Sequence, residues 1–252
     1  MKYHRLMGFA LILSLLGCGQ NSDLSHKNGN LFDIALIKRY TLTVPEPSGL
    51  SLSADSSFLW TVSDQNGKVY ALDFVGRALS SFAVKADNLD LEGVCADPDG
   101  KHLWLVNERV RELIRCDLDG NILIKKKLLS GDDNSGLEGI AYNAADSILY
   151  ILKEKEPGIL LILNNELETV RILSLDFAAD YSGAAWSEKY QALWIISDES
   201  KSLSLFSPDS GILGTVNFSL DQAEGVAVDE RNQKLWLVSD SRAELLSYSI
   251  DW

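Results

Sequence analysis

The chain has 252 residues and a formal net charge of −13, from 36 acidic and 23 basic side chains. This excess of negative charge argues against nucleic acid and anionic membrane surfaces as partners, and fits a protein that binds cations or is simply soluble. The length is one that a single all-β domain can fill without a second hydrophobic core.

The N-terminal segment has the pattern of an export signal. Lys2, His4 and Arg5 precede the apolar run "LMGFALILSLLG", which is shorter than the roughly 20 residues of a membrane span. The sequence "LLGC" resembles a bacterial lipobox, in which Cys18 becomes the acylated first residue of the mature protein. An ordinary signal peptide followed by an incidental cysteine is the alternative.

We therefore expect a signal peptide over residues 1–17, and a lipidated cysteine with a flexible polar tether over residues 18–33. Loss of the signal peptide removes two cations and moves the formal charge from −13 to −15. The expected location is the bacterial cell envelope, with the lipid as the one membrane attachment. The residue after the cysteine is Gly19 rather than an aspartate, and in this the sequence resembles outer-membrane lipoproteins.

The rest of the chain contains five copies of one pattern, each anchored on a glycine that usually follows a glutamate. A large aromatic residue comes eleven residues after each glycine, and an acid comes fifteen residues after it. The anchor glycines are Gly49, Gly93, Gly139, Gly183 and Gly225, the aromatic residues are Trp60, Trp104, Tyr150, Trp194 and Trp236, and the acids are Asp64, Glu108, Glu154, Asp198 and Asp240. A period of 42 to 46 residues is that of a propeller blade.

Each copy predicts four antiparallel strands. In the first copy, "GLSLSADSSFLWTVSD" is a hairpin, and "KVYALD" and "ALSSFAV" supply the third and fourth strands. The last copy ends after its third strand, "ELLSYSID", whereas an extra strand, residues 34–44, precedes the first copy. We therefore predict an all-β fold over residues 34–252: a five-bladed β-propeller of four-stranded antiparallel blades, in which the N-terminal strand completes the last blade.

Cys95 and Cys116 fall on the first and third strands of the second blade. Two strand spacings separate them by about 9 to 10 Å. A disulfide needs Cα atoms closer than about 7 Å, so we predict that both thiols are free. The repeated aromatic residues fall in middle strands, and we predict that they are core residues.

Carboxylates converge on one mouth of the predicted channel, because the first strand of a blade begins, and its second strand ends, on the same face. The residues before the anchor glycines are Ser48, Glu92, Glu138, Ser182 and Glu224, and Glu46 lies nearby. The loops that lead into these strands add Asp87, Asp90, Asp132, Asp133, Asp176, Asp180 and Asp221. Mutual repulsion would raise the pKa values of such carboxylates unless cations intervene.

Two readings of this face stay open. In the first, Glu92, Glu138 and Glu224, with Glu46 as a fourth candidate, bind a metal ion; without histidines or paired thiols there, the oxygen donors favour Ca²⁺, with Mg²⁺ second. In the second, the acids form ion pairs with neighbouring bases. Those bases are Lys68, Arg109, Arg111, Lys153, Lys201 and Arg242. The five strand-end acids, with Arg109 and Arg111, are the expected ligand-binding rim.

The segments "EPSGL", "LWTVSD", "DLEGV", "LWLVNE", "GLEGIAY", "AEGVAVD" and "LWLVSDS", in this order after the lipobox, resemble the SdiA-regulated family, the YjiK-like bacterial lipoproteins. The resemblance implies a five-bladed propeller, similar to NHL-repeat propellers, with bound calcium and no assigned activity. Similar gluconolactonase-like propellers are metal-dependent hydrolases. Ser48 and Ser182 depart from the glutamate pattern, so the site would not be five-fold.

Two functions follow from these expectations. In the first, the protein is a monomeric cell-envelope module that binds Ca²⁺ and presents its rim to a small molecule or an envelope protein. In the second, Ca²⁺ activates water against a lactone or phosphoester, with a rim glutamate as base and Arg109 or Arg111 holding an anionic group. The sequence offers no Ser-His-Asp arrangement and leaves open whether the protein is an enzyme.

Overall fold

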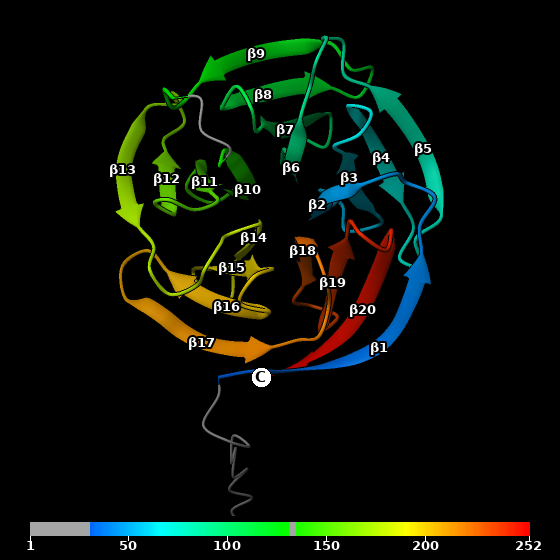
Figure 1. Cartoon of the computed structure of the whole chain (residues 1–252), viewed down its shortest axis with the longest axis vertical. Helices are drawn as coiled ribbons and strands as arrows, with labels where there is room; N and C mark the ends of the chain where they lie inside the picture. The colour runs from blue at the N-terminus through cyan, green and yellow to red at the C-terminus, as the bar shows by residue number, and fades with distance from the viewer. Residues whose placement is uncertain (1–30, 132–134) are drawn as a thin grey trace, which may run out of the picture.

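Every repeat of the sequence forms one four-stranded antiparallel sheet, and the five sheets stand around a central axis (Figure 1). The computed structural model describes residues 31–131 and 135–252, and in these residues it contains twenty β-strands. Among them there is no helix with the length and apolar character needed to cross a membrane. The signal peptide and Cys18 lie outside the described residues. The five-bladed β-propeller predicted from the repeat is confirmed.

The blades follow one another along the chain. Blade 1 contains β2 (Pro47–Leu52), β3 (Leu59–Ser63), β4 (Lys68–Leu72) and β5 (Ala78–Ala83). Blade 2 contains β6 (Leu91–Ala96), β7 (His102–Asn107), β8 (Glu112–Asp117) and β9 (Ile122–Lys127). Blade 3 contains β10 (Leu137–Asn143), β11 (Ile148–Lys153), β12 (Ile159–Leu163) and β13 (Thr169–Ser174). Blade 4 contains β14 (Gly183–Ser187), β15 (Ala192–Ser197), β16 (Ser202–Ser207) and β17 (Gly211–Asn217). Blade 5 contains β18 (Ala223–Asp229), β19 (Lys234–Ser239), β20 (Glu244–Asp251) and the N-terminal strand β1 (Asp33–Thr41).

The ring is closed by pairing the two ends of the described chain. Strand β1 pairs with β20 from Asp33 opposite Asp251 to Thr41 opposite Glu244, and the two strands run side by side in Figure 1. The expected clasp is therefore confirmed, although the strand ends at Thr41 rather than Val44. One further backbone hydrogen bond, from the Leu42 amide to the Ala243 carbonyl at 2.7 Å, extends the pairing beyond the strand.

Hydrophobic clusters fill the spaces between neighbouring blades. Each of the five clusters combines side chains from two adjacent sheets, and the fifth joins blade 5 to blade 1. Side chains of a middle strand alternate between two clusters: Leu105 packs toward blade 1 and Trp104 toward blade 3. Because both faces of a middle strand are buried, its sequence is a continuous apolar run.

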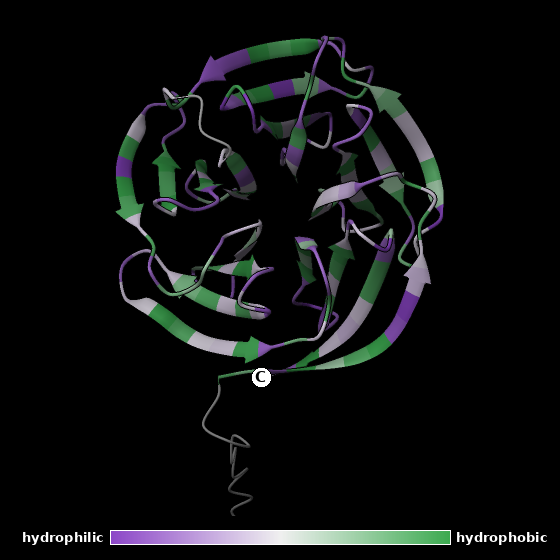
Figure 2. Cartoon of the chain, in the orientation of Figure 1, coloured by the Kyte–Doolittle hydropathy of each residue, from purple (hydrophilic) through white to green (hydrophobic). Residues whose placement is uncertain are grey.

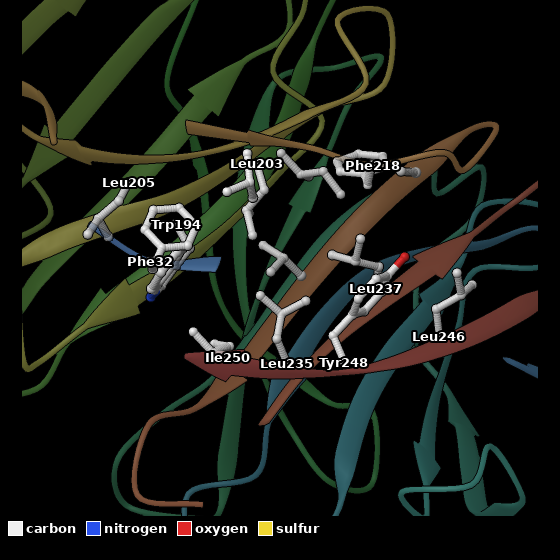
Figure 3. Close-up of a cluster of buried hydrophobic side chains, with 14 of the residues drawn as sticks. Phe32, Trp194, Leu203, Leu205, Phe218, Leu235, Leu237, Leu246, Tyr248 and Ile250 are labelled. Atoms are coloured by element: carbon white, nitrogen blue, oxygen red, sulfur yellow. The ribbon is translucent and has the colours of Figure 1, made fainter. Parts of the chain in front are cut away.

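The repeated aromatic residues belong to this core, as predicted. Trp194 is fully buried, and the Phe32 ring meets it edge-on with ring centroids 4.6 Å apart. Figure 3 shows both rings beside the leucines of blades 4 and 5. Phe32 directly precedes β1, so the clasp also contributes to the packing between these two blades.

The outermost strands have one face toward solvent. Side chains along β9 alternate between half-buried and exposed, and hydrophilic and hydrophobic residues mix on the outer strands in Figure 2. The two cysteines lie inside the protein, on β6 and β8, where both are buried and free as predicted.

The anchor glycines bring the first strands of neighbouring blades into backbone contact around the axis. A Cβ atom on Gly93 would lie 2.2 Å from the carbonyl oxygen of Glu138, and one on Gly225 would lie 2.5 Å from the carbonyl carbon of Gly49. Real Cβ atoms do not approach so closely, so no larger residue fits here without a shift of the backbone. We call this level of the channel the glycine ring.

Candidate functional site

A cavity of about 240 Å³ lies on one side of the glycine ring, and carboxylates dominate its lining. We call it the acid mouth. It is lined by Glu46, Ser48, Asp64, Glu92, Glu138, Glu154, Asp180, Ser182, Asp198, Glu199, Gln222, Glu224 and Asp240. All four metal-ligand candidates of the sequence are in this set, as are four of the five strand-end acids.

A β-bulge directs the residue before the anchor glycine into the acid mouth. The pairing register shifts at Glu92 in blade 2 and at Glu224 in blade 5, and shifts at or beside the anchor glycine also occur in blades 1 and 3. Bulges commonly re-aim a side chain beside a functional site. The Glu-Gly pair therefore combines a redirected carboxylate with a glycine that allows the next blade to approach.

Backbone hydrogen bonds hold the strand-end acids at the same mouth. The amide of Glu108 donates to the carbonyl of Asp90 at 2.8 Å, and the amide of Glu154 donates to the carbonyl of Gly136 at 3.2 Å. Asp64 and Asp240 form equivalent bonds to the carbonyls of residues 46 and 222. In four blades, this contact joins the end of the second strand to the segment that enters the first strand.

Glu138 is the most confined carboxylate of the acid mouth. Only 8% of its surface is exposed, and its carboxylate forms no hydrogen bond or ion pair with any residue in the ranges 31–131 and 135–252. Burial, and then repulsion from neighbouring glutamates, raises the pKa of Glu138 well above its ordinary value. A buried carboxylate without a partner is costly unless it is protonated or binds a cation.

Glu138 is the centre of one group of three carboxylates, and Glu92 belongs to another. One oxygen each of Glu108, Glu138 and Glu154 lie within 4.8 Å of one another. The same limit holds for oxygens of Asp64, Asp90 and Glu92. Each group combines an inner-strand glutamate with strand-end or loop acids.

The other inner-strand glutamates also favour the protonated state when no cation is bound. Burial raises the pKa of Glu92 to about 9, although the hydroxyl of Ser48 donates a hydrogen bond to this carboxylate. Burial, together with the charges of Asp198 and Asp240, raises the pKa of Glu224 to about 8. Burial and the contact with Asp90 raise the pKa of Asp64 to about 6.

Some of the strand-end and loop acids form ion pairs with neighbouring bases, as in the second interpretation of the sequence. Asp198 pairs with Lys201 at 2.7 Å, and Asp90 pairs with the exposed Arg109 at 3.2 Å. Arg242 pairs with Asp221, at 3.0 Å. These bases neutralise the periphery of the acid mouth, and no basic residue is part of the described cavity lining.

Arg111 lies outside the cavity lining, although its position beside Glu108 led us to expect it on the rim. Its backbone φ is +55°, its side chain is buried, and its guanidinium donates hydrogen bonds to the carbonyls of Ser130 and Ser135 at 2.8 and 3.1 Å. Glu108 and Arg109 are also absent from the lining, although Glu108 is one of the three carboxylates of the Glu138 group.

Sequence reasoning missed Glu199 and Gln222 as lining residues, and named Asp180 only among the loop acids. A signal existed: the residue three positions before the anchor glycine is Glu46, Asp90, Asp180 or Gln222 in four copies. The carboxylate of Asp180 accepts hydrogen bonds from Ser197 Oγ and the Glu199 amide. Asp132 and Asp133 fall outside the described residues.

The donor set can bind a hard cation. Ca²⁺ takes six to eight oxygen ligands at about 2.3 to 2.6 Å, so opposite ligands of one ion are about 4.8 Å apart. The oxygens of the Glu138 group lie within that separation. The charge of a cation would also relieve the repulsion among these carboxylates.

The fold is shared with several structures of low sequence identity. Glutaminyl cyclase of Myxococcus xanthus aligns with a TM-score of 0.65 and 12% identity, over 86% of this chain and 96% of that chain. A chain of a nidogen/laminin complex aligns with a TM-score of 0.60 and 12% identity, over 80% of this chain and 74% of that chain. Aldose sugar dehydrogenase of Streptomyces coelicolor aligns with a TM-score of 0.55 and 12% identity, over 87% and 98%.

These likenesses show the propeller fold alone. The family assignment comes from a different comparison, in which residues 35–243 match the family described as SdiA-regulated. This match includes strands of all five blades and the Glu-Gly pairs of the acid mouth, and it ends just before β20. The chain belongs to the SdiA-regulated family.

Proposed function

We propose that this protein is a cell-envelope binding module whose acid mouth binds Ca²⁺. The observation that carries the proposal is Glu138, a buried carboxylate that lines the cavity without a partner among the described residues. Two further carboxylates, Glu108 and Glu154, have oxygens within 4.8 Å of it. Neither group of three carboxylates contains a histidine or a cysteine, and an all-oxygen site favours Ca²⁺, with Mg²⁺ second.

The proposed ligands differ in part from those expected from sequence. Glu138 remains central, with Glu108 and Glu154 from the strand ends as its partners. Glu92, Glu224 and Glu46 line the same cavity and supply further oxygens or balance the charge of the ion. A bound cation would hold together loops of blades 2 and 3, and would thereby fix the shape of the rim.

A binding role is favoured because the described lining contains no histidine, cysteine or lysine, and both of its serine hydroxyls donate to groups of the protein itself. It has two serines: Ser48 donates to Glu92, and Ser182 donates to the Ala223 carbonyl at 2.7 Å. Both hydroxyls thus hold the site in shape. A cavity of about 240 Å³ exceeds the space of one ion, so a small molecule could bind above it; this same observation keeps a metal-dependent hydrolase as the second candidate.

Thermal melting tests the metal site. At 100 times its dissociation constant, a ligand that binds only the folded state adds about 2.7 kcal/mol to the free energy of unfolding. We expect Ca²⁺ to raise the melting temperature, Mg²⁺ to raise it less, and a chelator to reverse both. Glu138→Gln should abolish the response. Glu166→Gln, which changes an exposed acid on the outer part of blade 3, should leave it intact.

A parent protein whose melting temperature does not respond to Ca²⁺ would contradict the metal proposal. To separate binding from catalysis, purified protein is incubated with panels of lactones and phosphoesters, with calcium and with chelator. Binding predicts no turnover. Turnover that disappears in Glu138→Gln would establish the hydrolase instead.

The lipid anchor is part of the same proposal and rests on "LLGC" after a basic start. In cells that express the full-length chain, Cys18→Ser should remove labelling by a palmitate analogue and release the protein from the membrane fraction. Cys116→Ser, at a buried free thiol, is the matched control and should stay labelled. Membrane retention of the Cys18→Ser variant would show that the anchor is wrong.

A further inference from the structure

A second cavity lies on the other side of the glycine ring and has the opposite chemistry. It measures about 270 Å³, and we call it the apolar mouth. The residue three positions after the anchor glycine lines it in all five blades. These residues are Leu52, Ala96, Tyr142, Trp186 and Val228. The position is thus equivalent around the ring, with two large aromatic side chains on blades 3 and 4 and alanine on blade 2.

The described lining of the apolar mouth contains no charged side chain. Its one serine is engaged by the protein: Ser51 Oγ donates to the Leu52 carbonyl and accepts from the Ala96 amide. The Trp186 ring stacks on Tyr150, and its Nε1 donates to Glu188 at 2.9 Å. The side chains that face the cavity are thus uncharged, and the lining exposes polar backbone as well as apolar and aromatic side chains.

A side groove of about 420 Å³ adjoins the apolar mouth between blades 1 and 2. The two cavities share Ala54, Ala96 and Pro98. The groove adds the aromatic rings of Phe58 and Trp60, which meet edge-on at 4.8 Å. A ligand can therefore extend from the apolar mouth into the groove across a shared wall that carries no charged side chain.

The charge at the groove is negative. The exposed Asp55 forms no ion pair with a residue of the described ranges, whereas Asp99 pairs with His102 and Arg115. Hydrogen bonds from Ser57 and Ser53 lower the pKa of Asp55, so this carboxylate stays ionised at neutral pH. An uncompensated anion thus stands beside apolar and aromatic walls.

We propose that the apolar mouth and its side groove bind an organic cation with an apolar body. The body fills the apolar mouth, and an ammonium or guanidinium group lies in the groove beside Asp55 and the aromatic rings. Transfer of apolar surface from water supplies affinity, and attraction to a carboxylate and to ring faces supplies preference for positive charge. An anion of the same shape would meet Asp55 and bind more weakly.

Isothermal titration with three ligands of one chain length tests this. The probes are decyltrimethylammonium, decanol and decanoate, each below its aggregation concentration and at low ionic strength. We expect affinity to fall in the order cation, alcohol, carboxylate, and the advantage of the cation to shrink as salt is added. Binding should be unaffected by chelator and by Glu138→Gln, so that its failure is distinguishable from failure of the calcium site.

Two pairs of variants locate the site. Asp55→Asn should weaken binding of the cation about two- to fivefold while changing decanol little, whereas Asp146→Asn, at an acid that lines neither cavity, should change nothing. Ala96→Phe places a ring in the wall that both cavities share and should weaken all binding by about tenfold or more. Ala145→Phe, at an exposed neighbour of the lining residue Ala144, is its control.

Several results would overturn the proposal. These are the absence of saturable binding by decyltrimethylammonium, equal affinity for decanoate, or binding that Ala96→Phe leaves unchanged. Association of two copies through this face, seen as a dimer that Ala96→Phe dissociates, would also assign the surface to a different occupant.

Discussion

The two mouths of the channel are built from the same five inner strands and have opposite chemistry. One position before the anchor glycine, three blades carry a glutamate, and the cavity there is crowded with carboxylates. Three positions after it, all five blades carry an apolar residue, and no described charged side chain lines that cavity. The difference shows that the repeat fixes the geometry of both mouths, while single positions within it fix their chemistry.

The two mouths also differ in energetic cost. Buried carboxylates without partners oppose folding until they are protonated or bind a cation. Half-buried apolar side chains around an open cavity forgo some hydrophobic stabilisation but leave no charge unsatisfied. Conditions that change protonation or metal binding should therefore act on the acid mouth and leave the apolar mouth unaffected.

The largest expected effect comes from removing what both mouths share, the closed ring. A truncation that begins at residue 45 deletes β1 and exposes the edge of β20, so we expect loss of the cooperative thermal transition. A truncation that begins at Leu31 keeps β1 and Phe32 and should melt like the parent. Circular dichroism on both proteins checks this; an equally stable product of the longer truncation would contradict the clasp.

The second largest effect is expected from placing a larger residue in the glycine ring. Gly93→Ala places a Cβ 2.2 Å from the Glu138 carbonyl oxygen, and overpacking of this kind costs about 1 to 3 kcal/mol in the free energy of unfolding. Because Glu138 moves with its carbonyl, the calcium response should also weaken. Gly211→Ala has no other atom within 4 Å of the new Cβ, but its φ of +81° makes alanine strained, so it should cost about 1 to 2 kcal/mol and keep the calcium response. Urea denaturation with and without calcium measures both.

The third effect, a dependence on pH, separates the mouths. Burial raises the folded-state pKa of Glu92 to about 9 and of Glu224 to about 8, above the ordinary value of 4.5. In this window the folded protein binds more protons than the unfolded chain, so the free energy of unfolding without metal should fall as pH rises from about 5 to 9. The double variant with glutamine at both positions should show a flatter profile. Stability that instead rises over this range would contradict the carboxylate geometry.

Calcium affinity should change in the opposite direction. The carboxylates must lose their protons to bind the ion, so Ca²⁺ should bind more tightly as pH rises through about 8 to 9. Binding of decyltrimethylammonium to the apolar mouth should stay constant over the same range, because the Asp55 carboxylate is already ionised. Titrations at several pH values would show whether the two mouths respond separately.

The smallest expected effect concerns Arg109, whose exposed guanidinium pairs with Asp90. Exposed ion pairs contribute about 0 to 1 kcal/mol, so Arg109→Ala should change the melting temperature little. Removing a positive charge from beside the Glu92 group should tighten calcium binding slightly at low salt, and this gain should vanish at high salt. Lys101→Ala, in a turn on the opposite face, is the control and should leave calcium binding unchanged.

The blades and their closure could be predicted from sequence because a fixed period leaves few architectures. An aromatic residue always eleven positions after the glycine requires the same hairpin in each copy, and "ELLSYSID" without a fourth strand requires a partner. Core residues such as Trp194 could be predicted for the same reason, because an apolar run in a middle strand indicates that both faces of the strand are buried.

The sequence could not predict which carboxylates of the acid mouth lie close to one another. Which oxygens lie within 4.8 Å of one another depends on the side-chain directions at the bulges; the repeat marks where the bulges lie but does not specify these directions. Arg111 was expected on the rim from its neighbours, but its buried guanidinium donates to the backbone carbonyls of Ser130 and Ser135. The apolar mouth was missed because Leu52 and Val228 read as ordinary strand residues.

The pairing of β1 with β20 also bears on how the chain folds during synthesis. Strand β1 is synthesised before the other strands of the propeller, and its partner β20 is synthesised after them. Four blades contain only neighbouring segments and can pair locally, whereas closure joins the first strand of the propeller to the last and has a large loop-closure entropy. Ring closure should therefore be the late step of folding, and until then the edges of β1 and β20 stay open to pairing with other chains.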